Sequence, residues 1–252
     1  MGSTRLHGKV MMPINGRPLI DYMIERLKHS EFIDQIVIAT TDSSLDQKIV
    51  SWCKQSKVTC FQGDENDVLS RYYQCAKQFD ASIVIRMTSD CPLIDPKIID
   101  EVIKSYLERD DVDFSSNTVP LPCLYPDGMD VEVFGIDLLE RAHNEAQLPS
   151  EREHVTFFMW KTGKFKTYRL DPPKDISQYR FTVDYPQDFE VIKAILEQLY
   201  VENQTFSLSD LIQFMNENPH LSALQKNIDR YGGWQKSYQQ DHQFLNSISL
   251  QT

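Results

Sequence analysis

Short apolar runs alternate with longer helical patterns along the first half of the chain, and this alternation constrains the fold most. The runs at 35–39 and 82–86 are short and rich in β-branched residues, which is typical of buried strands. Pro18 opens a stretch with apolar residues at helical spacing over 19–27, and Asp95 can cap a second such stretch. The repeated order predicts an α/β fold: a mixed, mainly parallel sheet with helices on both faces.

The same signals predict the remaining elements. Ser150 and Glu153 have the spacing of a capping box and begin a predicted helix. We find no linker and no internal repeat, so we expect one domain over 1–202 with a helical extension over 203–252. The further predicted elements are helices at 45–55, 66–78, 95–107, 136–146, 150–161, 187–200 and 208–217, and strands at 58–61, 129–134, 165–170 and 180–183.

Charge and composition exclude several classes of protein. The chain has 26 Lys and Arg against 37 Asp and Glu, a net charge of −11, so it is no general binder of nucleic acid or anionic membranes. No apolar run approaches the roughly 18 residues of a membrane span, and the first residues lack the apolar core of a signal peptide. We therefore expect a cytoplasmic protein. Five cysteines without a CxxC pair argue against a disulfide framework and against a zinc site.

The opening segment is the first candidate site. Residues 1–28 carry five basic against two acidic side chains, in contrast to the acidic remainder. The small residues Gly2, Ser3 and Thr4 permit close backbone approach, and Arg5 and Lys9 can face phosphate oxygens. The alternative is a solvated chain end. Phosphate loops of α/β folds leave the end of a strand, and no strand precedes this one, so we expect the first strand of the sheet to be missing.

Two carboxylates form the second candidate site. Asp90 follows the strand at 82–86, and Asp184 ends the strand at 180–183. Ligands of open parallel sheets bind beyond the carboxyl ends of the strands, so both side chains are expected over the same edge. Two carboxylates with phosphate and water suit Mg²⁺. The alternative for Asp184 is a cap on the helix that follows.

Several other polar residues interrupt apolar patterns. Asp130 and Glu132 face one side of a strand, which either meets solvent or lines a polar cleft. Asp111 and Asp113 resemble the DxD metal motif of nucleotide-sugar glycosyltransferases, a spacing that also arises by chance. Arg86 lies in an apolar strand and needs an anionic partner if buried. The further candidates are Arg71, Arg152, His154 and Arg180.

Six segments in this order resemble one known family. They are Gly2-Ser-Thr-Arg-Leu-x-Gly-Lys9, Ile38-Ala-Thr-Thr-Asp42, Asp67-Val-Leu-x-Arg-Tyr72, Arg86-Met-Thr-Ser-Asp-Cys-Pro-Leu-Ile-Asp95, Arg152-Glu-His-Val-Thr156 and Phe181-Thr-Val-Asp-Tyr-Pro186. Over about residues 1–240 the chain resembles the SpsF-type cytidylyltransferase-like family of spore coat polysaccharide synthesis. That family is similar to the synthetases that activate Kdo and sialic acids with CTP. The resemblance implies a Rossmann-like nucleotide-diphospho-sugar transferase fold and Mg²⁺-dependent cytidylyl transfer from CTP to a sugar or sugar acid, with release of pyrophosphate, for surface polysaccharide or glycan synthesis.

The resemblance also implies roles for the candidate residues. Arg5 and Lys9 would be catalytic and hold the triphosphate, and Asp90 with Asp184 would bind Mg²⁺. The implied nucleotide-binding residues are Gly2, Ser3, Thr4, Thr40, Thr41, Asp42, Arg71 and Arg86. The implied acceptor-binding residues are Asp130, Glu132, Arg152, His154 and Arg180.

The chain departs from the family pattern in two places. Members normally begin with a strand that ends in an alanine-arginine pair, which is missing before Met1, and His7 stands where proline is usual. Two other functions therefore stay open: a nucleotide-sugar-dependent glycosyltransferase and a nucleotide-binding module without turnover. Expected partners are CTP and the acceptor, with neither nucleic acid nor membrane, and a homodimer is an option that similar synthetases suggest.

Overall fold

The computed structural model describes residues 2–3, 5–201 and 204–249. Its main sheet has four strands in the order β5-β7-β6-β8. Strand β7 runs antiparallel to both β5 and β6, and β6 pairs in parallel with β8. A separate parallel pair is formed by β3 and β4, and β1 with β2 makes a small hairpin. The strands are β1 (Pro13–Ile14), β2 (Arg17–Pro18), β3 (Val37–Thr41), β4 (Thr59–Gly63), β5 (Ile83–Arg86), β6 (Phe114–Ser116), β7 (Glu132–Gly135) and β8 (Thr167–Arg169).

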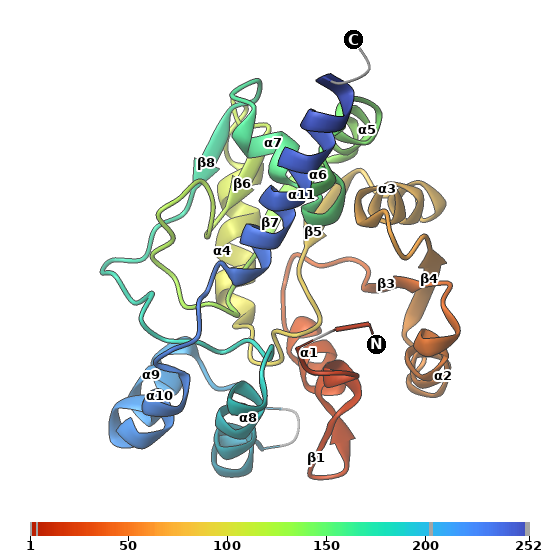
Figure 1. The fold of residues 1–252 in the computed structure, drawn as a ribbon. Coiled ribbons are helices and arrows are strands. Elements are labelled where there is room, and N and C mark those ends of the chain that lie inside the picture. The colour runs from red at the N-terminus through yellow and green to blue at the C-terminus, as the bar shows by residue number, and fades with distance from the viewer. Residues whose placement is uncertain (1, 4, 202–203, 250–252) are drawn as a thin grey trace.

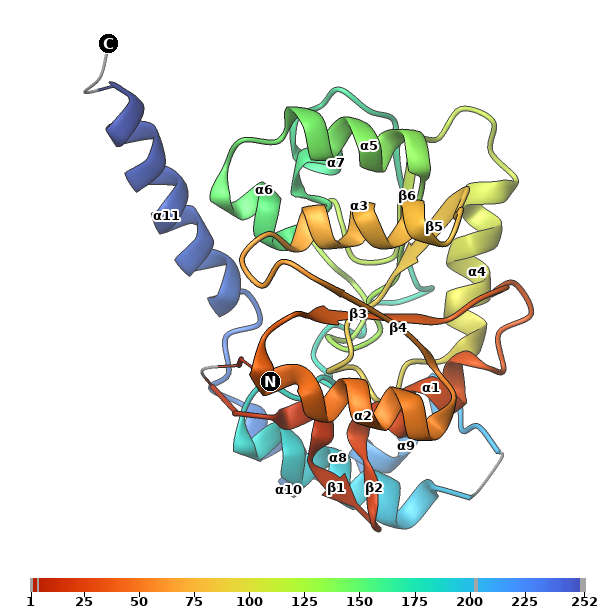
Figure 2. The ribbon, with the colours of Figure 1, turned by 90° about the vertical axis from the view of Figure 1, so that its right-hand side faces the viewer.

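Helices surround both sheets (Figures 1 and 2). Their starts follow local chemistry: the Asp95 carboxylate accepts a hydrogen bond from the Lys97 N–H at 2.9 Å, and Pro96 occupies the first turn of α4. The helices are η1 (Lys9–Met11), α1 (Leu19–Leu27), η2 (Ser44–Asp46), α2 (Gln47–Ser56), α3 (Val68–Gln78), α4 (Pro96–Leu107), α5 (Ile136–Glu145), α6 (Pro149–His154), α7 (Phe157–Lys161), α8 (Pro186–Leu199), α9 (Leu208–Glu217), α10 (Pro219–Gln225) and α11 (Gly232–Ser249).

The main sheet separates two apolar cores. Neighbouring side chains of a strand point to opposite faces, and in β7 Val133 lies in one core while Phe134 lies in the other. Helices α1, α4 and α8 contribute to the core of Val133, and α3, α5 and α7 contribute to the core of Phe134. The expected α/β fold with a mixed sheet and helices on both faces is confirmed. The parallel share is smaller than the βα alternation predicts, because β7 runs against both of its neighbours.

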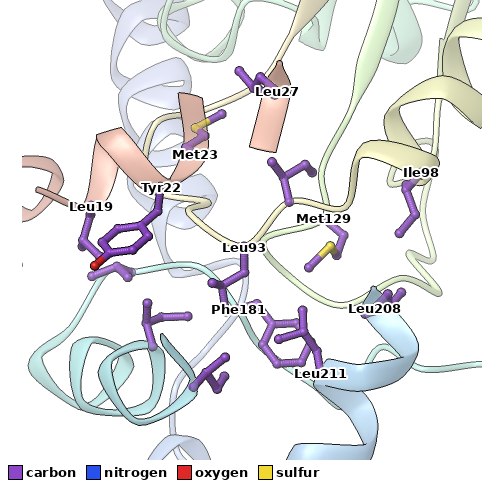
Figure 3. Close-up of a cluster of buried hydrophobic side chains, with 14 of the residues drawn as sticks. Leu19, Tyr22, Met23, Leu27, Leu93, Ile98, Met129, Phe181, Leu208 and Leu211 are labelled. Atoms are coloured by element: carbon purple, nitrogen blue, oxygen red, sulfur yellow. The ribbon is translucent and has the colours of Figure 1, made fainter. Parts of the chain in front are cut away.

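The larger core joins the two ends of the chain. Leu19, Tyr22 and Met23 of α1 lie in the same core as Leu93 and Phe181 (Figure 3). Helix α9 adds further leucines from the other side, so the segment after residue 203 packs into the same core as the first helix. None of the helices in the described part of the chain is long and apolar enough to span a bilayer.

Each of the two sheets has an edge strand, which is β3 in the parallel pair and β5 in the main sheet. Strand β3 pairs only with β4, and β5 pairs only with β7, so in the described residues no strand joins them. The apolar side chains of Ile38 and Ile85 are therefore half-buried, although their sequence predicts fully buried strands.

Two predicted elements differ from the structure. The helix at 150–161 is two helices, because Val155 has a φ of 61° that breaks the helical path. The helix begins earlier than Ser150: the Glu151 carboxylate accepts from the Leu148 N–H at 3.1 Å. The strand at 180–183 is reduced to one bridge between Asp127 and Arg180.

Candidate active site

Lys9 lies where the opening loop turns into η1. Gly8 before it has a φ of 68°, a left-handed conformation that glycine adopts without strain. Val10 after it is buried, which anchors the turn in the core. The Lys9 Nζ donates to Asp90 Oδ2 at 2.6 Å and to Asp184 Oδ1 at 2.8 Å. The two carboxylates predicted to share one edge therefore meet at a single nitrogen.

The backbone keeps the two acidic residues together. The Val183 N–H donates to the Asp90 carbonyl at 2.9 Å, so the loop after β5 runs beside the segment that carries Asp184. The helix after Asp184 is capped by another residue, since Asp188 Oδ2 accepts from the Asp184 N–H at 2.9 Å and the Tyr185 N–H at 3.0 Å. The Asp184 carboxylate is thus left for side chains, and the alternative that it caps α8 is wrong.

Three basic side chains contact the Asp184 carboxylate. Arg5 donates to Asp184 Oδ1 at 2.6 Å, and its guanidinium lies 5.3 Å from the centre of the Tyr185 ring. Arg180 donates to Asp184 Oδ2 at 2.9 Å. With Lys9 this makes a cluster that holds two carboxylates and three basic side chains, which we call the Lys9 cluster.

Lys9 and Asp90 favour each other's charged form. Burial alone would lower the pKa of Lys9, but the carboxylates of Asp90 and Asp184 raise it above its ordinary value. Burial likewise opposes ionisation of Asp90, yet Lys9 lowers the pKa of that carboxyl below its usual range. Lys9 and Asp90 therefore both stay ionised at neutral pH.

The other residues of the opening loop are less engaged. The Ser3 hydroxyl accepts from the Leu6 N–H at 3.3 Å, and Gly2 is exposed. Thr4 lies outside the described residues.

The predicted base-binding residues sit at the end of β3. The hydroxyls of Thr40 and Thr41 both donate to Asp46 Oδ2, at 2.7 and 2.8 Å. The Asp42 N–H donates to the Gly63 carbonyl at 3.0 Å, and its side chain is exposed. The two threonine hydroxyls thus stabilise the turn into η2. Of Thr40, Thr41 and Asp42, Asp42 is the exposed residue.

Two of the predicted arginines have a buried Nε that finds no hydrogen-bond acceptor among the described residues. Arg71 on α3 donates through Nη1 to the Asp64 carbonyl at 2.5 Å. Arg86 in β5 pairs with Glu132 Oε2 at 2.5 Å, which supplies the anion that its place in a strand demands. Glu132 Oε1 accepts from the Thr156 hydroxyl at 2.7 Å, so both carboxylate oxygens of Glu132 are occupied. A buried donor without an acceptor costs free energy, and each Nε is a place where a ligand would relieve that cost.

Arg152 and His154 hold helices together. Arg152 pairs with Asp67, the cap of α3, through Nε at 3.1 Å and Nη2 at 2.5 Å. The His154 ring is within 2.8 Å of the Ser237 hydroxyl on α11 and stacks on Phe157 at 4.4 Å. Both side chains contact neighbouring helices, away from the hydrogen bonds of the Lys9 cluster.

His154 predicts a pH dependence of stability. Burial, with Arg86 and Lys161 nearby, lowers the pKa of this histidine to about 4, against the partial opposition of Asp241. The unfolded chain, with an ordinary histidine pKa of about 6.5, binds more protons below that pH, so stability is lost as pH falls from about 6.5 to 4. The full loss is about 3 kcal/mol. Urea unfolding at pH 7 and pH 4 of the wild type and His154→Gln measures it.

Comparing the wild type with His154→Gln isolates the contribution of this histidine to the pH dependence of stability. Carboxylates contribute to the pH slope in both proteins, so only the difference reports on His154. Equal slopes would contradict a neutral, buried ring.

The remaining candidates are Arg180, Asp130 and Asp113. Arg180 also pairs with Asp127 and with Asp188, at 2.9 Å to the latter. Asp130 Oδ2 accepts from the Gly128 N–H at 2.8 Å. Asp113 of the DxD-like pair accepts from the Lys166 N–H at 2.8 Å and joins β6 to β8, and the described residues hold no group of three acidic, cysteine or histidine side chains suited to a metal.

The site contains three residues that we did not select from the sequence. Asp188 is the third residue of α8, three positions after the N-cap residue Tyr185, and this capping spacing is a signal that could have found it. Asp127 precedes a glycine in a turn-like segment that we noted for its other acidic residues. Arg230 has no local signal, because only the packing of the chain's last part brings it to within 3.7 Å of Asp130.

Comparison with known proteins identifies the family. A family profile described as cytidylyltransferase matches residues 1–212. The chain belongs to the cytidylyltransferase family. The spore coat polysaccharide biosynthesis protein SpsF of Bacillus subtilis is 32% identical over 228 residues, covering 87% of this chain and 92% of SpsF. The resemblance inferred from the ordered segments is confirmed.

Solved structures agree with this family. A cytidylyltransferase of Leptospira borgpetersenii superposes with a TM-score of 0.82 at 36% identity, over 88% of this cytidylyltransferase-family chain and 92% of that one. A synthetase of CMP-2-keto-3-deoxy-manno-octonic acid, solved with CTP, superposes with a TM-score of 0.58 at 16% identity, over 79% and 95%. The second likeness shows the fold, that of nucleotide-diphospho-sugar transferases.

Proposed function

We propose that this protein transfers a cytidylyl group from CTP to a sugar or sugar acid and releases pyrophosphate. The observation that carries the proposal is the Lys9 cluster, in which a lysine and two carboxylates from distant parts of the chain meet within hydrogen-bond distance. Family membership and the likeness to SpsF support CTP as the donor and a glycan precursor as the acceptor.

The donor set of the cluster fits Mg²⁺. Asp90 and Asp184 offer two carboxylates that converge on one point, and Mg²⁺ binds through one or two carboxylates with phosphates and water completing its shell. Mg²⁺, when bound to these two residues, would neutralise charge on the phosphate oxygens. Asp188 fixes the backbone of Asp184 and would keep that ligand in place.

The basic side chains would position and neutralise the triphosphate. Lys9 and Arg5 are the mobile partners of Asp184, because their long side chains can turn from carboxylate to phosphate oxygens without backbone movement. Arg180 is held by Asp127 and Asp188 as well, so it would stay with the carboxylates. Transfer at phosphorus is catalysed mainly by such positioning and charge neutralisation. An acceptor oxygen would then attack the α-phosphorus in line and expel pyrophosphate.

An assay of pyrophosphate release tests the proposal. The full chain is incubated with Mg²⁺, one of the four nucleoside triphosphates, and Kdo, N-acetylneuraminic acid or a neutral sugar. We expect release with CTP and at least one acceptor, and a fall of about 10²-fold or more in Asp90→Ala, since one charged group of a preorganised site supplies that much. Release with CTP no higher than in Asp90→Ala for every acceptor would refute it.

Two further measurements separate the alternatives. A rise in melting temperature with UDP- or GDP-sugar but not with CTP would favour a glycosyltransferase. CTP binding without product would favour a binding module.

A further inference from the structure

The guanidinium of Arg180 links Asp127 to Asp184 of the Lys9 cluster. Arg180 donates through Nη1 to Asp127 Oδ2 and through Nη2 to Asp184 Oδ2, the latter at 2.9 Å. The arginine side chain is only 9% exposed, and Asp188 holds its Nε at 2.9 Å, so this bridge has little freedom. The two carboxylates are thus kept at a fixed separation.

The backbone around Asp127 is also fixed. The Phe181 N–H donates to the Asp127 carbonyl at 2.6 Å. Gly128 lies against the same segment, since a Cβ there would come within 2.5 Å of the Phe181 carbonyl carbon and the Thr182 nitrogen. The turn that carries Asp127 is therefore pressed against the segment that leads to Asp184.

One oxygen of Asp127 remains free for a ligand. Oδ2 is taken by Arg180, while among the described residues Oδ1 has no hydrogen-bond donor. Over 125–134, Asp127 and Asp130 are the two residues that are not buried. Asp127 thus lies one arginine away from Asp184, and its side chain is 18% exposed.

Asp130 and Arg230 complete the surroundings of Asp127. Arg230 donates to the Tyr125 carbonyl at 2.8 Å and lies 3.7 Å from Asp130 Oδ1, so it reaches this turn from the segment between α10 and α11. Burial and the charge of Asp130 raise the pKa of Asp127 to about 7, although Arg180 and Arg230 oppose this. A carboxylate so poised can gain and lose a proton near neutral pH.

We propose that Asp127 is the general base that takes the proton from the attacking hydroxyl of the acceptor. The acceptor O–H bond breaks as its oxygen bonds to the α-phosphorus, the proton passes to Asp127, and the bond from the α-phosphorus to the bridging oxygen breaks to release pyrophosphate. Asp130 is a poorer candidate, because within the described part of the chain no side chain bridges it to Asp184 as Arg180 bridges Asp127. The assignment rests on the proposed function. It implies that a hydroxyl of the acceptor, and not the carboxylate of a sugar-acid acceptor, lies against Asp127 and Asp130.

Asp127→Asn tests the assignment. Asparagine still offers an oxygen to Arg180, so we expect a folded chain with an unchanged circular dichroism spectrum. We expect kcat at pH 8 to fall about 10²–10⁴-fold, while the Kd for CTP, measured by calorimetry, changes less than about threefold. Asp127→Glu, which restores a carboxylate, should recover part of kcat. Asp137→Asn, an exposed acidic residue on α5, is the matched control and should keep the wild-type rate.

The pH profile supplies a second readout. The wild-type kcat should rise with pH through about 7, and this rise should be absent in Asp127→Asn. The titratable and charged groups that act on Asp127 are Asp130, Asp184, Arg180, Arg230, Cys91, Cys123 and Tyr231. An Asp127→Asn kcat within twofold of wild type, or an unchanged profile, overturns the assignment alone. No pyrophosphate from the wild type with any acceptor overturns the proposed function and this assignment with it.

Discussion

Lys9→Met is expected to lower kcat/KM for CTP by about 10²–10³-fold, the usual cost of removing one charged donor from a preorganised site. The methionine side chain is one atom shorter than that of lysine and offers no hydrogen to a phosphate oxygen. Asp90 loses its ion-pair partner, while Asp184 keeps Arg5 and Arg180. Steady-state pyrophosphate release over a range of CTP concentrations measures the effect.

The same substitution should also reduce stability. Removing one partner of a partly buried charged pair costs about 1–3 kcal/mol. Lys48→Met is the matched control, because Lys48 is exposed on α2. A Lys9→Met chain with the wild-type kcat/KM would show that the lysine serves the fold alone, and the Lys9 cluster would lose its role in the reaction.

Gly128→Ala is expected to lower the free energy of unfolding by about 2–5 kcal/mol, which combines the strain of a left-handed residue with overpacking against backbone. Gly128 has a φ of 100°, and an added Cβ would lie 2.5 Å from the backbone of Phe181 and Thr182. Backbone atoms in this position cannot move aside as a flexible side chain can. Urea unfolding monitored by circular dichroism gives the difference.

Gly163→Ala separates the two causes. Gly163 also has a left-handed φ, of 69°, but no atom lies within 4 Å of the added Cβ. Its cost should therefore be the strain alone, about 1–2 kcal/mol. If the free energy of unfolding falls equally in both variants, overpacking against Phe181 and Thr182 does not contribute at Gly128. If overpacking does contribute, Gly128→Ala should also lower activity, because the turn with Asp127 moves away from Asp184.

The charges of the Lys9 cluster suit the proposed binding of a nucleotide by an acidic chain. Its three basic side chains face the two carboxylates of Asp90 and Asp184, so the cluster has a formal net charge of +1 before any ligand binds. A bound triphosphate and metal ion would bring both signs of charge and would take the place of these internal ion pairs. The net charge of −11 therefore reflects the remaining surface and says little about the site.

Local sequence determined the elements whose signals lie within a few residues. Asp95 followed by Pro96 predicts the start of α4, and the helix begins there because the carboxylate accepts from the backbone inside it. The apolar stripe of 19–27 likewise predicts α1 and its buried face. The order of the strands and helices predicts that the ends of two distant segments share an edge, and Asp90 and Asp184 do meet.

Tertiary structure alone decided the rest. The predicted strand at 180–183 forms a single bridge, and β7 runs against its neighbours, because pairing depends on partners that local patterns do not specify. Arg230 reaches Asp130 across a sequence separation of 100 residues, and only the packing of the C-terminal helices sets that contact. Periodicity and capping depend on residues within one or two helical turns of each other. The partners in a charged cluster depend instead on how distant segments pack in the folded core.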